Sequence, residues 1–133
     1  MARQLPEKAP TLEEIERLAA EAFETIPPEL RRHVANIVFQ VEEFPDEETE
    51  REMELESPFD ILGLYRGVAL PNRSVNHIRR SQDMIFLYRR PLLDYWCETA
   101  EDLFAVVRHV LIHEIGHHFG FSDDDMERIE NLP

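Results

Sequence analysis

The sequence has a single cysteine, few basic residues and no long apolar run. With Cys97 alone, the chain can form no internal disulfide and no four-cysteine zinc site. Its 14 Lys and Arg residues stand against 28 Asp and Glu residues, giving a formal net charge of -14. This balance argues against nucleic acid as a partner, because phosphate neutralisation needs basic clusters. No apolar stretch approaches the length that spans a bilayer, so we expect no membrane partner.

The first ten residues are charged, contain proline and lack the apolar core of a secretory signal. We therefore expect a cytoplasmic protein with a flexible N-terminus at residues 1–10. Residues 11–133 fit one domain, since a chain of 133 residues with 43% hydrophobic residues is of the size that builds one core. The sequence leaves the oligomeric state open.

The N-terminal half has the pattern of one amphipathic helix followed by strands. Residues 11–14 (TLEE) predict a helix start, because the Thr hydroxyl can accept from the Glu14 amide. Apolar residues then recur at helical spacing until Pro27-Pro28, which cannot continue the helical hydrogen bonds. Three segments have the β-branched and aromatic content of strands: 34–41, 62–65 and 84–88.

Charge is segregated along the middle of the chain. Residues 42–56 carry nine acidic side chains and one Arg, which is typical of a solvated acidic loop. Residues 61–93 carry the opposite excess, with Asp83 as the only acid among six arginines: Arg66, Arg73, Arg79, Arg80, Arg89 and Arg90. Two interpretations stay open, namely pairing between the two segments and a basic lip that faces a substrate.

A second helix is expected to begin at Thr99 as its N-cap and to run to about His118. Its apolar stripes lead into histidines, which indicates a buried helix with a site at its C-terminal end. Gly120 stands where a left-handed cap ends a helix. The residues 123–130 can form a last short helix.

The end of this helix contains the run HEIGHHFGFSD at residues 113–123. On a helix, His113 and His117 lie about 40° apart around the axis and one turn apart along it. Both imidazoles can therefore reach one zinc ion at about 2.0–2.1 Å. Glu114 lies about 100° around from His113, which suits a base acting on zinc-bound water better than a ligand.

The third ligand has to come from outside the helix. Gly120 can adopt a positive φ, so the chain can reverse and return a later residue towards the metal. A carboxylate is a competent zinc ligand, and Asp123 is the predicted one, with Asp124 and Asp125 as alternatives in the same unbroken run. The other two histidines of this helix, His109 and His118, are expected to be neighbours of the site.

The run at 113–123 resembles the extended motif HExxHxxGxx(H/D) of the zincin metallopeptidases. Over most of residues 11–130 the chain also resembles the small bacterial minimal zincin family. The features that match are the chain's size, the N-terminal helix, the strand that ends in VEEFP, the segment LGLYRG, the strand IFLYR and the helix HEIGHHFG.

This resemblance implies an α+β fold of the zincin type. A small mixed sheet would pack on the motif helix beside the N-terminal amphipathic helix, with an edge strand lining the cleft. It also implies that His113, His117 and Asp123 hold one Zn²⁺ and that Glu114 is the catalytic base. Ten residues follow Asp123 here, which is too few for the Met-turn and further subdomain of metzincins, and Met126 lies too close to Asp123 to be that turn.

Three functions are compatible with these features. The first is a zinc-dependent peptidase that binds a peptide or extended protein segment along an edge strand at 84–88. Tyr65, Tyr88 and Tyr95 are candidates to assist the oxyanion there, although each is expected first as a core or rim residue. The second is a metal-stabilised binding module with latent or lost activity. The third, a zinc-dependent endoribonuclease, is disfavoured by the net charge, by Glu114 where such enzymes have Gly, and by Asp123 where they have His.

Overall fold

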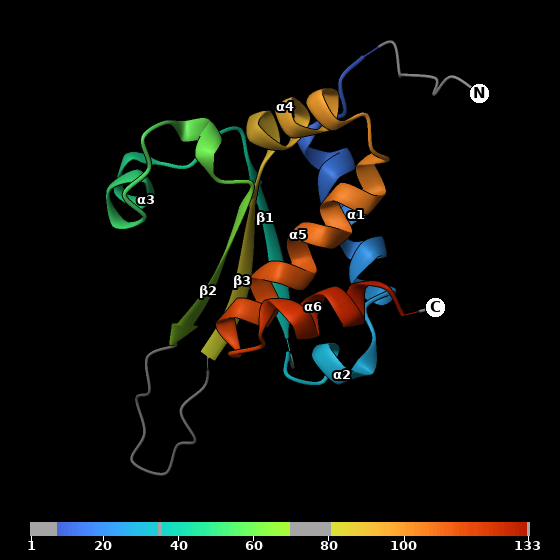
Figure 1. Cartoon of the computed structure of the whole chain (residues 1–133). Coiled ribbons are helices and arrows are strands. Elements are labelled where there is room, and N and C mark those ends of the chain that lie inside the picture. The colour runs from blue at the N-terminus through green and yellow to red at the C-terminus, as the bar shows by residue number, and fades with distance from the viewer. Residues whose placement is uncertain (1–7, 35, 70–80, 133) are drawn as a thin grey trace, which may run out of the picture.

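A computed structural model describes residues 8–34, 36–69 and 81–132 of the chain (Figure 1). Most of the predicted flexible N-terminus, residues 1–7, lies outside this range. The elements in chain order are α1 (Leu12–Glu24), α2 (Pro28–Arg31), β1 (Ile37–Glu42), α3 (Glu47–Glu52), the 3₁₀ helix η1 (Pro58–Asp60), β2 (Gly63–Ala69), β3 (Ser81–Tyr88), α4 (Arg89–Thr99), α5 (Leu103–His118) and α6 (Asp123–Glu130).

The three strands form one mixed sheet in the order β1-β3-β2. β1 runs parallel to β3, and β2 runs antiparallel to it. Helix α1 packs on β1, α5 packs on β2, and the two helices pack on each other, while α3 lies across the strands from them (Figure 1). The α+β fold with a small mixed sheet against the motif helix is therefore confirmed.

Strand order corrects one expectation. Residues 84–88 belong to β3, which is hydrogen-bonded on both sides and is therefore the central strand. Its peptide groups are used within the sheet and cannot take up an extended peptide. The edge strands are β1 and β2, so a substrate that adds to this sheet has to use one of them.

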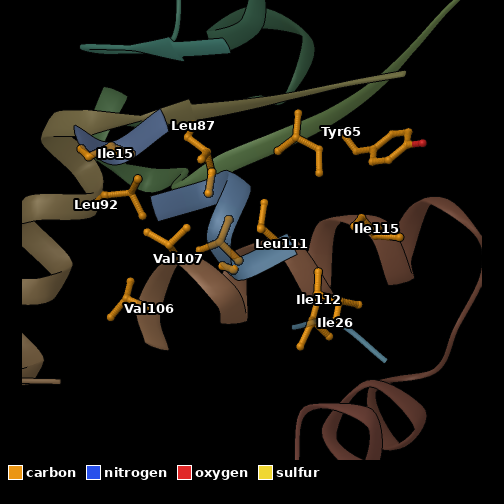
Figure 2. Packing of buried hydrophobic residues seen from close by; sticks show 14 of the residues in the cluster. Ile15, Ile26, Tyr65, Leu87, Leu92, Val106, Val107, Leu111, Ile112 and Ile115 are labelled. Carbon is orange, nitrogen blue, oxygen red and sulfur yellow. The ribbon is translucent and has the colours of Figure 1, made fainter. Parts of the chain in front are cut away.

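The core lies between the sheet and the helices α1 and α5. Ile15 of α1, Leu87 of β3 and Leu111 of α5 are fully buried and meet there (Figure 2). Helix α5 buries side chains on most of its circumference, because Val106 and Ile112, on other faces than Leu111, are also fully buried. A helix enclosed in this way holds its polar C-terminal residues in fixed positions.

The predicted start of α1 and the predicted end of α5 are both confirmed. The Thr11 hydroxyl accepts from the Glu14 amide at 3.1 Å and caps α1. At the end of α5, Gly120 has a φ of 81°, and its N–H donates to the His117 carbonyl at 3.2 Å. The Phe121 N–H donates to the Gly116 carbonyl at 2.8 Å, which completes the paired hydrogen bonds of a Schellman cap. This cap turns the chain back towards the motif.

The expected helix start at Thr99 is wrong. Thr99 is the last residue of α4, a helix that the sequence interpretation missed, and its hydroxyl donates to the Tyr95 carbonyl at 2.9 Å. Ala100 has a φ of 56°, so the chain leaves the helical conformation there. The motif helix α5 begins three residues later, and Asp102 is its N-cap, accepting from the Ala105 N–H at 3.3 Å.

Because Asp102 and not Thr99 caps α5, replacing these two residues by alanine should lower the free energy of unfolding by different amounts. Asp102→Ala should lower the free energy of unfolding by about 1 kcal/mol, because it removes an N-cap acceptor. Thr99→Ala should cost less than about 0.5 kcal/mol, since its hydroxyl only adds a bond to a carbonyl that already lies in a helix. Urea unfolding followed by circular dichroism measures both. Equal losses would contradict the assignment of Asp102 as the cap.

Two of the three described arginines of residues 61–93 form ion pairs with the acidic segment. Arg66 lies 2.6 Å from Glu52, and Arg89 lies 2.9 Å from Glu43. These contacts favour internal pairing over a substrate-facing lip for both residues. Arg73, Arg79 and Arg80 lie outside the described residues, so the interpretation is not tested for them.

Among the helices of the described residues, none combines the length and the apolar content needed to cross a bilayer.

Candidate metal centre

The last turns of α5 present the two histidines of the motif on neighbouring positions of one face. The side chain of His113 is 27% exposed and that of His117 is 57% exposed. Their rings meet edge to face with centroids 5.9 Å apart. Burial lowers the pKa of His113, and the nearby His109 adds to this effect. Zinc binds the neutral imidazole, so this environment favours the ligand form.

Asp123 is brought next to His117 by the turn that the Gly120 cap creates. It is the first residue of α6, and its Oδ1 lies 3.5 Å from His117 Nε2. Two ligands on one tetrahedral zinc lie about 3.4 Å apart when each bond is about 2.1 Å long. The alternative ligand Asp125 lies instead 3.8 Å from the Arg128 guanidinium. The pair His117 and Asp123 therefore has the spacing of two zinc ligands.

Glu114 lies between the motif helix and the sheet. Its Oε1 accepts a hydrogen bond from the Tyr65 N–H of β2 at 3.3 Å. Burial raises the pKa of the Glu114 carboxyl above its ordinary value, and the Tyr65 N–H partly offsets this. The Tyr65 ring stacks on His118 with centroids 4.0 Å apart, so β2 and the end of α5 form one wall beside the carboxylate.

The raised pKa predicts that Glu114 destabilises the metal-free protein. Its ordinary pKa is 4.5. Above that pH the unfolded chain ionises the carboxyl freely, whereas the folded protein has to ionise it in a partly buried site, so stability falls as pH rises through the folded pKa. Glu114→Gln should therefore stabilise the metal-free fold at pH 7.5, and the gain should shrink as the pH falls towards 4.5. Urea unfolding in EDTA across this range measures it, and a gain independent of pH would contradict it.

Another group of ligand atoms lies one turn earlier on α5, apart from His117 and Asp123. His109, His113 and Glu130 offer ligand atoms within 4.8 Å of one another, and among the described residues this is the set of three that comes together. His117 and Asp123 do not join it. The sequence interpretation placed His109 as a neighbour and did not consider Glu130. One signal was available, because Glu130 follows Asp123 by seven residues and so lies on nearly the same face of a helix.

The tyrosines differ in their distance from the motif. Tyr65 is 7% exposed and adjoins Glu114 through its own N–H. Tyr88, at the end of β3, is 2% exposed, and burial raises its pKa to about 12. Tyr95 packs partly buried against the core from α4. Of the three oxyanion candidates, Tyr65 is the one whose backbone contacts the motif.

The donor set of this region fits a zinc ion. It offers imidazole nitrogens and a carboxylate oxygen, with two donors already at ligand spacing. The family model of the zincin-like metallopeptidases matches residues 34–132, a range that runs from before β1 to beyond α6. A comparison with curated proteins finds no match. The family match covers the whole sheet and the whole motif helix, and the chain belongs to the zincin-like metallopeptidase family.

Proposed function

We propose that this protein hydrolyses peptide bonds as a zinc-dependent metallopeptidase. In this proposal His113, His117 and Asp123 hold one Zn²⁺, and Glu114 is the general base. The observation that carries it is the position of Glu114, a partly buried carboxylate next to a histidine pair and held by a backbone N–H of the sheet. Zinc, when bound, supplies Lewis-acid activation of water and of the substrate carbonyl.

The residues around Glu114 suit proton transfer. A carboxylate with a raised pKa accepts a proton from water more readily than one with an ordinary pKa, and can pass that proton to a leaving amine. The Tyr65 N–H fixes one carboxylate oxygen, which leaves the other free to face the reacting water. Glu114 therefore needs no large movement to serve in both steps.

The edge of β2 is the proposed binding site for the substrate backbone. The Tyr65 N–H donates to Glu114, whereas the Leu62 carbonyl accepts from Tyr88 of β3. Ladder hydrogen bonds alternate along an antiparallel strand, so the Tyr65 carbonyl and the peptide groups of Gly67 face the free edge. An extended peptide that adds to this edge would pass close to Glu114. The proposed partner is thus an extended peptide, and the cytoplasmic location stays a prediction.

The test is a peptide-library assay on the full chain together with metal analysis. Zinc-loaded protein should cleave a subset of peptides, EDTA should stop cleavage, and added Zn²⁺ should restore it. Asp123→Asn should weaken zinc binding and lower turnover at limiting zinc. If zinc-loaded protein cleaves no peptide and yet binds some of them, the proposal fails in favour of a metal-stabilised binding module.

A further inference from the structure

Helices α5 and α6 carry ligand-type side chains in two matching tiers. Histidines stand on α5 at 109, 113 and 117, and carboxylates stand on α6 at 123 and 130. The lower tier is the contact of His117 with Asp123. The upper tier joins His109 and His113 to Glu130. The two helices therefore bring ligand-type side chains together at two places, the lower tier and the upper tier.

One distance in the upper tier equals that between two ligands of a bound ion, and the other two are those of a hydrogen bond. His113 Nε2 lies 3.5 Å from Glu130 Oε1, which is the spacing of two ligands on a tetrahedral zinc, about 3.4 Å. His109 Nδ1 lies 2.8 Å from Glu130 Oε2 and 2.9 Å from Oε1. A carboxylate can take one imidazole by a plain hydrogen bond, but here both rings face the same carboxylate. The rings of His109 and His113 lie with centroids 4.0 Å apart.

The position of Glu130 is fixed by packing rather than by its own side chain. Ile129 beside it is fully buried. The Arg108 guanidinium donates to the Glu130 carbonyl at 3.0 Å and to the Thr25 hydroxyl at 2.9 Å, so it joins the end of α6 to α5 and α1. Glu130 is therefore held over the histidines in a way that an isolated surface ion pair is not.

We propose a second divalent-metal position formed by His109 Nδ1, His113 Nε2 and Glu130, one helical turn from the first and suited to Zn²⁺. A neutral imidazole offers one ring nitrogen as a ligand while the other carries a proton. His113 can therefore serve one position at a time, and the two positions are alternatives. An ion in the upper tier takes His113 away from the site of the proposed peptidase, so this position competes with activity.

The experiment isolates each tier and measures zinc binding by calorimetry, with Co²⁺ absorption as a second readout. In the variant His117→Ala/Asp123→Asn, the full chain should still bind one Zn²⁺. Adding Glu130→Gln to that background should weaken binding by at least about 100-fold, because it removes a ligand. Adding Glu127→Gln, an exposed carboxylate on the same helix, should leave binding unchanged. Glutamine keeps an oxygen that can accept from His109, which protects the fold, and thermal melting by circular dichroism verifies this.

Three results would overturn the proposal. They are no zinc bound by His117→Ala/Asp123→Asn, zinc binding that survives the added Glu130→Gln, and two equivalents of zinc in the wild-type chain, which would exclude sharing of His113. The peptidase proposal is tested separately, in the variant His109→Asn/Glu130→Gln. This variant lacks two ligands of the upper tier but keeps His113, His117 and Asp123, so it should bind one ion in the lower tier.

Discussion

Glu114→Gln should lower peptide hydrolysis by about 10²–10⁴-fold while leaving the zinc content unchanged. Glutamine has the shape of glutamate and can still accept from the Tyr65 N–H. It cannot accept a proton from water, so the loss should appear in kcat while KM stays within a few-fold. The measurement is steady-state cleavage of the best library peptide, with zinc determined by metal analysis on the same sample.

Two controls separate this effect from general damage. Glu127→Gln removes the same charge from an exposed position on α6 and should keep wild-type turnover. Circular dichroism should show an unchanged fold for both variants. Turnover of Glu114→Gln within threefold of wild type would rule out Glu114 as the base, and loss of zinc would show that it acts on the metal site instead.

Features that depend on adjacent residues could be predicted from the sequence. The N-cap Thr11, the left-handed Gly120 and the span of α6 each follow from side chains within a few positions. The positions of His113 and His117 on one helix follow from its 3.6-residue period. The same local reasoning missed α4, a helix that contains Pro91. Pro91 is the third residue of that helix, in the first turn, where a proline costs little.

Features that depend on packing between distant segments could not be predicted. The central position of β3 follows from its pairing with β1 and β2, and no pattern within residues 84–88 distinguishes a central from an edge strand. The approach of Glu130 to His109 depends on how α6 lies across α5, across 21 residues of sequence. The metal assignment rests on both kinds of feature, with the histidines predicted locally and the carboxylates placed by the helix packing.

That packing depends on the absence of a side chain at Gly116. Gly116 is buried on α5, and a Cβ there would lie 2.7 Å from Met126 Cγ of α6 and would also overlap Met126 Sδ. Met126 is fully buried, so it has little room to move aside. The glycine therefore lets α6 approach the motif helix closely enough to bring Asp123 to His117 and Glu130 to His113.

Gly116→Ala should consequently destabilise the protein by about 1–3 kcal/mol, the usual cost of overpacking a core. This is the reverse of the effect of alanine in an open helix, where it stabilises by about 1 kcal/mol over glycine. Urea unfolding in EDTA measures the change, and zinc affinity should fall with it because α6 carries Asp123 and Glu130.

A second background decides whether the contact with Met126 is the cause. Met126→Ala leaves space where the new Cβ would lie, at an expected cost of about 2–5 kcal/mol for the cavity. In that background Gly116→Ala should become stabilising, since it gains helix propensity and partly fills the cavity. The change of sign is a coupling between two residues in contact, which a double-mutant cycle measures directly. If Gly116→Ala destabilises equally in both backgrounds, the close approach of α5 and α6 does not depend on this glycine.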